Sequence, residues 1–336
     1  MPTLRLDDPA GEWSGVRLDA GPFSAVCRRR AGGWERQIDD RQIWRLEYRF
    51  EVTAAGRKRT VYLPDPLAQN QIDSPFGTRS VWQRADYAPP SWLDQPALPG
   101  DCETLRLPSA LSAPLTVRLW SPDGLRPGDD APLLWAHDGS DYRDRARLGH
   151  WAGVRIGDGS LPPFRIAYAD APRRMQWYSG SDRYLRSVSR GLTALTETYP
   201  TTPGIAVIGA SLGGLTSMLV AQRDKRVAAV FAQSGSFFTG QPFDKDNQPW
   251  RWFTRVSGLV SGLAQRPPRQ CPVVGMTCGL AEGNFDNNQA MATTLGDLGL
   301  DVRFLGHPDL HNWTNWRDSL EPILPNLLRE AWSAVG

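Results

Sequence analysis

One serine of this chain lies between glycines in a pattern that predicts covalent catalysis. Ser211 is the centre of residues 209–213, which read G-A-S-L-G and match the G-x-S-x-G motif. The apolar, mostly β-branched run 205–208 is typical of a buried strand, and apolar residues at helical spacing follow the serine. Small residues two positions before and after a serine let strand and helix approach closely across a sharp turn. The pattern therefore favours a nucleophile elbow over an ordinary structural turn.

A serine nucleophile needs a general base, and the chain contains four histidines. In hydrolases with this elbow the acid follows the serine and the histidine follows the acid, which excludes His137 and His150. His311 lies in a loop between the last predicted strand and the C-terminal helix. His307 is closer to that strand and precedes a proline, which suits a surface or cleft-lining residue. We expect His311 to be the base and keep His307 as the alternative.

The acid of such a triad should follow the penultimate predicted strand. Glu282 comes a short distance beyond the end of that strand, as expected of a loop residue. Asp286 lies at the start of a predicted helix, 287–295, where a carboxylate also stabilises the helix N-terminus. We expect Glu282 to be the acid, with Asp286 as the alternative.

An oxyanion formed by serine attack needs backbone N–H donors aimed at it. One donor should come from Leu212, the residue after the nucleophile. The other should come from Gly139 or Ser140, in the turn after the apolar run 132–136, because a glycine lets the backbone approach a substrate. An ordinary turn at the end of a strand is compatible with the same residues.

Strands that alternate with helical segments must position these residues. From Cys102 onward, short apolar or alternating runs predict strands separated by helical patterns. Such a series predicts an α/β fold, the doubly wound and mostly parallel sheet of the α/β-hydrolases, with ligands bound at the carboxyl ends of the strands. We expect residues 101–336 to form this catalytic domain. The predicted strands are 104–107, 115–120, 132–136, 164–168, 205–208, 227–232, 272–277 and 301–304.

The residues before this domain follow different patterns. The stretch 43–52 alternates between apolar and polar residues, and similar short runs predict a small N-terminal β-sandwich over residues 1–66. Its aromatic residues suit core packing better than carbohydrate binding. Residues 67–100 are rich in proline, asparagine, serine and glutamine and are expected to form a linker. Trp82, Tyr87 and Trp92 either line one side of an active-site cleft or anchor this linker to the catalytic domain.

Composition excludes several other classes of protein. The formal net charge is only +2, which gives no support for nucleic-acid binding. The sequence has neither a signal-peptide pattern nor an apolar run long enough to span a membrane. We therefore expect a cytoplasmic protein with reduced thiols and with neither a metal nor a cofactor, since its cysteines lack metal-site spacing. The cysteines are Cys27, Cys102, Cys271 and Cys278.

Taken in order, these motifs resemble the enterochelin (enterobactin) esterase family. The segments are L-L-W-A-H-D-G-S-D-Y, G-A-S-L-G-G-L, Q-S-G-S-F-F, C-G-L-A-E-G-N-F-D-N-N and H-N-W-T-N-W-R. That family belongs to the esterase D and mycolyltransferase-like branch of the α/β-hydrolases. The resemblance runs from about Cys102 to the C-terminus and extends more loosely to the front part. It implies a serine esterase that opens a cyclic tri-catecholate siderophore to release iron, with its triad on Ser211, Glu282 and His311.

The chain departs from the family pattern near two of these motifs. Asp309 and Leu310 precede the histidine where the family usually has two glycines, and Asn312 follows it where the family has an aspartate. Arg173 and Arg174 lie in a segment where the family often carries a glutamate. These arginines either meet an anionic iron–catecholate or are ordinary surface charges. An expected substrate surface also includes the aromatic residues Trp82, Tyr87, Trp92 and Trp313.

Two alternatives to a siderophore esterase remain open from the sequence. The same triad serves an acyltransferase or a cyclase or thioesterase of natural-product assembly, and a siderophore-binding module would need no triad chemistry. In each case the expected partner is a small-molecule ester or siderophore, either iron-loaded or iron-free, and neither a nucleic acid nor a membrane.

Overall fold

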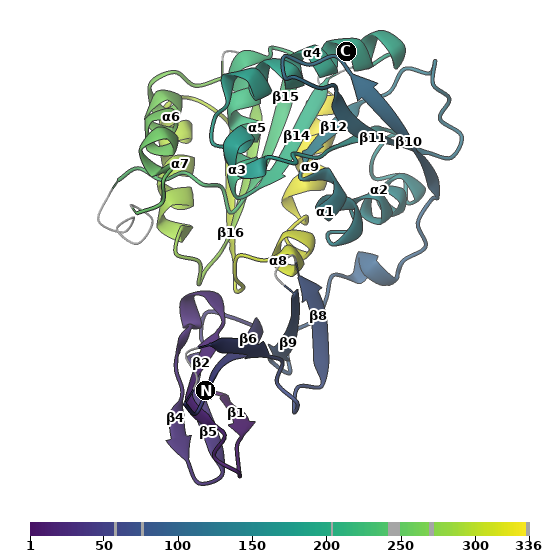
Figure 1. The fold of residues 1–336 in the computed structure, drawn as a ribbon. Helices are drawn as coiled ribbons and strands as arrows, with labels where there is room; N and C mark the ends of the chain where they lie inside the picture. The colour runs from purple at the N-terminus through teal and green to yellow at the C-terminus, as the bar shows by residue number, and fades with distance from the viewer. Residues whose placement is uncertain (57–58, 75–76, 203, 241–248, 269–271, 334–336) are drawn as a thin grey trace. The chain divides into compact units, whose positions relative to one another are not determined.

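The alternating runs of the first ninety residues and the strand–helix series after them belong to separate parts of the fold. The computed structural model describes residues 1–336 except 57–58, 75–76, 203, 241–248, 269–271 and 334–336. The described residues divide into two compact units (Figure 1). The first unit is Met1–Ala88 with the loop segments Gly279–Glu282 and His307–His311, and the second unit is the remainder.

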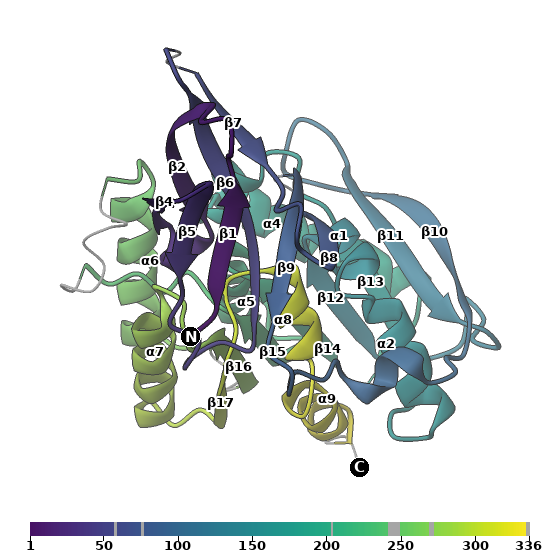
Figure 2. The same cartoon turned by 90° about the horizontal axis from the view of Figure 1, so that it is seen from below.

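The first unit is built from antiparallel strands. A small sheet has the order β1-β5-β4, and a larger one has the order β3-β2-β6-β9-β8, with β7 paired to β6. Figure 2 labels all of these strands except β3. In β6 the side chains of Leu46, Tyr48, Phe50 and Val52 are buried, as the predicted alternation requires. The strands are β1 (Thr3–Asp7), β2 (Trp13–Asp19), β3 (Ala25–Val26), β4 (Arg28–Arg30), β5 (Gly33–Gln37), β6 (Arg45–Ala54), β7 (Thr60–Leu63), β8 (Asn70–Ser74) and β9 (Gly77–Gln83).

The predicted linker 67–100 differs from the structure in its first half. Strands β8 and β9 form a hairpin, and β9 pairs with β6 so that Trp82 lies opposite Leu46. The first unit therefore continues to Ala88. The composition of the hairpin suggested a loop because one of its strands is mostly exposed and polar, whereas its order comes from backbone hydrogen bonds to β6.

The second unit contains a sheet with the order β10-β11-β13-β12-β14-β15-β16-β17. The pairs from β13 through β12, β14, β15 and β16 are parallel, and β10 and β11 are antiparallel additions at one edge. The strands are β10 (Gly100–Leu107), β11 (Leu115–Pro122), β12 (Leu133–His137), β13 (Arg165–Ala169), β14 (Ile205–Ala210), β15 (Val227–Gln233), β16 (Val273–Gly279) and β17 (Val302–His307).

Helices cover both faces of this sheet. Along β12, Leu133 and Trp135 belong to one apolar cluster while Leu134 and Ala136 belong to another, because successive side chains point to opposite faces. Helices α4 to α7 contribute to the first cluster, and α1, α2 and α9 contribute to the second. This confirms the predicted doubly wound α/β fold. The helices are α1 (Gly139–Asp144), α2 (Leu148–Gly157), α3 (Arg174–Tyr178), α4 (Asp182–Thr198), α5 (Leu212–Arg223), α6 (Phe253–Gln265), α7 (Phe285–Asp297), α8 (Trp313–Asp318) and α9 (Ile323–Ser333).

Three further observations concern the cysteines, membrane-spanning helices and metal sites. Cys27, Cys102 and Cys278 are free cysteines, and Cys271 lies outside the described residues. In the part of the chain that the structure describes, no helix combines the length and the apolar character needed to cross a bilayer. The same residues contain no group of histidine, cysteine and acidic side chains arranged to hold a metal ion.

Candidate active site

Ser211 occupies a strained turn between β14 and α5. Its backbone angles are φ 57° and ψ −121°, a region that residues with a side chain rarely adopt and that costs about 1–3 kcal/mol. The surrounding backbone holds this conformation: the Ser211 N–H donates to the Gln233 carbonyl at 2.8 Å, and the Ser236 N–H donates to the Ser211 carbonyl at 3.1 Å. The Ser236 hydroxyl lies 3.5 Å from the Ser211 hydroxyl. This geometry is that of a nucleophile elbow.

Close backbone packing requires a glycine at residue 209 of the motif and leaves little space at residues 213 and 214. A Cβ on Gly209 would lie 2.3 Å from the Gly213 carbonyl oxygen, and a Cβ on Gly214 would lie 3.2 Å from the Gly209 oxygen. Strand β14 and helix α5 therefore approach each other without room for a side chain at residue 209. A Cβ on Gly213 would lie 3.3 Å from Asp138 Oδ2, which places the turn after β12 beside the start of α5.

The turn after β12 is held by an ion pair. Asp138 has a left-handed backbone with φ 57°, and its carboxylate accepts hydrogen bonds from Arg174 Nε and Nη2 at 2.8 Å each. Arg174 Nη2 also donates to the Ala210 carbonyl at 3.2 Å, directly before the elbow serine. Burial raises the pKa of the Asp138 carboxyl, and the Arg174 guanidinium opposes that rise. Arg174 thus joins the ends of β12 and β14, and this pairing argues against its expected role as a substrate-binding cation.

Two of the three expected oxyanion donors begin helices. Leu212 is the first residue of α5 and Gly139 is the first of α1, so neither amide has an acceptor within its own helix. A Cβ on Gly139 would lie 2.4 Å from the Tyr168 carbonyl carbon, so glycine is needed there. The Ser140 N–H instead donates to Asp170 Oδ1 at 2.7 Å. The expectation that Ser140 supplies the donor is therefore wrong for this geometry, and Gly139 remains.

Glu282 and His311 are brought together in the first unit. His311 Nδ1 lies 2.6 Å from Glu282 Oε2, and the Gly279 N–H donates to Glu282 Oε1 at 2.8 Å. The Glu282 side chain is 1% exposed and that of His311 is 41% exposed. A proton assigned to Nδ1 leaves Nε2 as the basic nitrogen. Asp286 is exposed in the first turn of α7.

The remaining residues expected at the site lie in several different surroundings. His307 ends β17, and its ring packs edge-on against Trp44 with 6.2 Å between ring centroids. Trp92 is fully buried in a short 3-10 helix (Ser91–Asp94), so the expectation that it lines a substrate surface is wrong. Tyr87 packs against Trp44 with 5.9 Å between ring centroids. Trp82 is partly buried against the core of the first unit.

Two expected substrate residues lie at helix starts in the second unit. Trp313 is the first residue of α8 and packs against Tyr142 and Trp316, with ring centroids 5.1 and 4.7 Å away. Arg173 is exposed directly before α3.

Sequence reasoning missed a buried polar network behind the elbow. The Tyr142 hydroxyl donates to Gln233 Oε1 at 2.7 Å, and Gln233 Nε2 donates to the Trp316 carbonyl at 2.7 Å. Trp316 Nε1 donates to the Ser234 hydroxyl at 2.9 Å. These bonds tie α1 and α8 to the end of β15, whose backbone holds the elbow serine. The only sequence signal was the polar run Q-S-G-S directly after an apolar strand.

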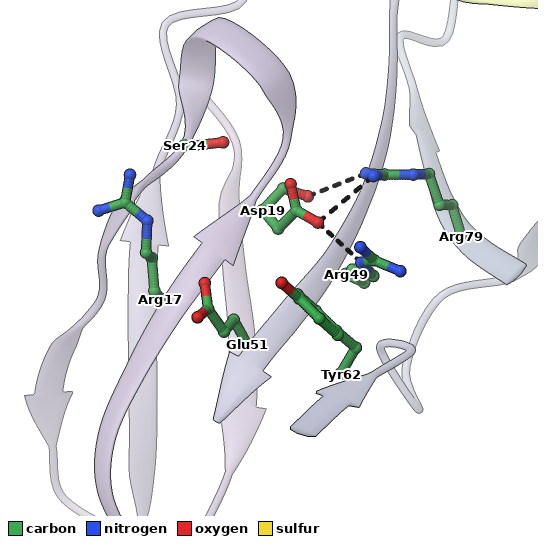
Figure 3. Close-up of a pocket in the computed structure, with 7 residues that line it drawn as sticks. All are labelled: Arg17, Asp19, Ser24, Arg49, Glu51, Tyr62 and Arg79. Atoms are coloured by element: carbon green, nitrogen blue, oxygen red, sulfur yellow. Dashed lines mark hydrogen bonds and ion pairs between the residues drawn. The ribbon is translucent and has the colours of Figure 1, made fainter. Parts of the chain in front are cut away.

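A separate cavity of about 460 Å³ lies on the larger sheet of the first unit (Figure 3). Within it, Asp19 Oδ2 accepts from Arg49 at 2.7 Å and from Arg79 at 3.3 Å, and the Arg49 guanidinium carbon lies 3.7 Å from the centroid of the Tyr62 ring. These charged groups therefore already satisfy one another. The cavity is lined by Arg17, Asp19, Ser24, Arg49, Glu51, Tyr62 and Arg79.

Comparisons with known proteins identify the fold and the family of this chain. A search of curated proteins finds no match. Similar solved structures include enterochelin esterase from Shigella flexneri, with 18% identity, a TM-score of 0.74 and coverage of 98% of this chain and 92% of that chain. Ferric enterobactin esterase from Salmonella typhimurium has 17% identity, a TM-score of 0.71 and coverage of 98% and 93%. A ferulic acid esterase has 18% identity and a TM-score of 0.58, with coverage of 69% of this chain and 98% of that chain.

These structural similarities establish a shared fold. Residues 109–327, well over half of the chain, match the model of the Esterase family, described as "Putative esterase". The matched region contains the elbow serine and the Glu282–His311 pair. This chain therefore belongs to the Esterase family and is a carboxylic-ester hydrolase.

Proposed function

We propose that this esterase hydrolyses the ester bonds of a catecholate siderophore of the enterobactin type through an acyl-enzyme. The observation that carries the substrate class is the extent of the structural similarity. The enterochelin esterase of Shigella flexneri matches 98% of this chain, which includes the N-terminal strands, whereas the ferulic acid esterase covers 69%. Solved structures of the Shigella enzyme include one in the presence of enterobactin and one in the presence of 2,3-dihydroxy-N-benzoyl-serine.

In the proposed reaction the Ser211 hydroxyl attacks the ester carbonyl. His311 Nε2 takes the serine proton and then delivers it to the leaving alcohol, and Glu282 holds the imidazole in the required tautomer and stabilises its cation. The Leu212 and Gly139 amides donate to the oxyanion. Water, activated by the same histidine, then attacks the acyl-enzyme and releases the acid.

This assignment is supported by the strained backbone of Ser211 and by the 2.6 Å contact between His311 Nδ1 and Glu282 Oε2. His311→Ala is expected to lower kcat on any ester by at least about 1000-fold, and His307→Ala by less than about threefold. Near-normal kcat in His311→Ala would remove that residue as the base.

The substrate proposal is tested by comparing kcat/KM for enterobactin, iron-loaded and iron-free, with kcat/KM for a short-chain nitrophenyl ester. We expect the catecholate trilactone to react faster, with dihydroxybenzoyl-serine units detected by mass spectrometry. Equal or lower kcat/KM for the trilactone would leave an esterase of another specificity. Ser211→Ala serves as the control for uncatalysed hydrolysis.

An acyltransferase or a cyclase would use the same acyl-enzyme but deliver it to an alcohol or amine. Adding a series of such nucleophiles during turnover separates the two reactions. A hydrolase releases mostly free acid, whereas dominant transfer to an added nucleophile would replace hydrolysis in the proposal.

A further inference from the structure

One residue of the N-terminal sheet contacts the loop that carries His311. Trp44 directly precedes β6, and its backbone N–H donates to the Pro308 carbonyl at 2.8 Å. Its indole Nε1 donates to Asp309 Oδ2 at 3.3 Å, and its ring meets the edge of the His307 ring. Trp44 therefore contacts each of the residues 307, 308 and 309, which end two positions before His311, although 265 positions separate it from Asp309.

Asp309 makes this contact structurally important because its side chain is completely buried. Its Oδ1 accepts from the Leu310 N–H at 2.7 Å, and its Oδ2 accepts from Trp44. A buried carboxyl oxygen that loses a donor is costly, so loss of the indole N–H favours a shift of the loop. The same loop places Leu310, 6% exposed, in the apolar core of the N-terminal strands.

The loop that carries Glu282 is attached to the same core. Ala281, directly before Glu282, packs against the apolar cluster that contains Leu310. The Leu280 N–H donates to the His307 carbonyl at 2.7 Å, which ties the two loops to each other. Both loop segments consequently belong to the same compact unit as the N-terminal strands.

We propose that Trp44 is a positioning residue for catalysis and that the N-terminal strands thereby hold His311 against Glu282. The inference rests on the proposed roles of these two residues. Trp44 touches no reacting atom; it fixes the path of residues 307–309, and that path sets where the His311 ring lies. A displacement of about 1 Å at a catalytic group can lower the rate about 100-fold, so a smaller shift of the His311 ring should lower it by less.

Trp44→Phe is the direct test because it keeps an aromatic ring and removes the indole N–H. Trp34→Phe is the matched control: Trp34 Nε1 also donates to a buried carboxylate of the N-terminal strands, Asp8 Oδ2, at 3.1 Å. We expect Trp44→Phe to lower kcat on a short-chain ester about 10-fold, with KM changed less than about twofold, because the defect lies in orientation of the base. Trp34→Phe should change kcat less than about twofold.

A double-mutant cycle with Glu282→Gln separates positioning from general destabilisation. If Trp44 acts through the Glu282–His311 pair, Trp44→Phe should lower kcat less than about twofold in the Glu282→Gln background. A wild-type kcat in Trp44→Phe, or the same fold-loss in both backgrounds, would overturn the inference. If Trp44→Phe fails to fold, Asp309→Asn in the same cycle decides, because Leu310 and Trp44 donate to different carboxylate oxygens and asparagine keeps only one acceptor oxygen. An unchanged kcat in Glu282→Gln alone would instead contradict the proposed triad, and this outcome is distinguishable from failure of the Trp44 proposal.

Discussion

Gly209→Ala is expected to damage the elbow, because the added methyl group meets backbone atoms. The new Cβ would lie 2.3 Å from the Gly213 carbonyl oxygen, 2.4 Å from the Gly213 carbonyl carbon and 2.9 Å from Ser217 Oγ. Real Cβ atoms essentially never approach other atoms this closely. Only the serine hydroxyl could rotate away, so strand β14 and helix α5 must separate.

The distance by which β14 and α5 must separate sets the size of the expected loss of activity. Ordinary van der Waals contact begins at 3.4 Å, so the Gly213 carbonyl must move by about 1 Å. This carbonyl belongs to the residue after Leu212, a proposed oxyanion donor. A shift of that size lowers kcat about 100-fold, and the overpacking costs roughly 1–3 kcal/mol of stability.

Measurement of kcat on a chromogenic ester, together with thermal unfolding, tests this expectation. Gly258→Ala is the matched control, because Gly258 lies in α6 and a Cβ there meets nothing within 4 Å. It should leave kcat unchanged and stabilise the protein by roughly 0.5–1 kcal/mol, as replacement of a helical glycine does. If Gly209→Ala keeps more than about a third of wild-type kcat, the close-packing argument for the elbow is refuted.

Further substitutions test the remaining site assignments and the acid stability of the fold. Ser211→Ala should lower esterase kcat by at least about 1000-fold without lowering the unfolding temperature, and turnover near wild type would exclude it as nucleophile. Glu282→Gln should reduce kcat more than Asp286→Asn does, and the reverse order would reassign the acid. Arg174→Gln should lower kcat on a short-chain ester about 10-fold, because Asp138 would lose its buried partner beside the elbow. An unchanged kcat on that ester with a raised KM for the catecholate trilactone would instead support a substrate-binding role. Burial, with a smaller contribution from Arg174, lowers the pKa of His137 to about 3 from 6.5. Between pH 6.5 and about 3, the unfolded chain therefore binds a proton at His137 that the folded protein does not bind. The free energy of unfolding should fall by roughly 1.4 kcal/mol for each pH unit as the pH drops through this range. Urea unfolding measured from pH 7 to 4.5 should show that the free energy of unfolding depends less steeply on pH in His137→Gln than in the wild type. An identical pH dependence would assign the acid sensitivity to other groups.

The sequence by itself determined the features that depend on neighbouring residues. The glycine spacing around Ser211 predicted a tight strand–turn–helix, and the backbone there has the strained φ of 57°. Apolar runs and alternation predicted the doubly wound sheet and the N-terminal strands, which the structure confirms. These predictions succeed because strand and helix periodicity, and the space a glycine leaves, are local properties of the chain.

Only the tertiary structure decided which polar groups pair with each other. Glu282 contacts His311, whereas the sequence had left Asp286 as an alternative; Arg174 pairs with Asp138, and the Ser140 amide is bonded to Asp170. Hairpin β8–β9 becomes ordered by pairing with β6, although its composition resembles a linker. Each of these contacts joins segments that are distant in sequence. Which of several acceptors a donor bonds depends on distances that the folded backbone sets, and a local sequence pattern carries no information on those distances.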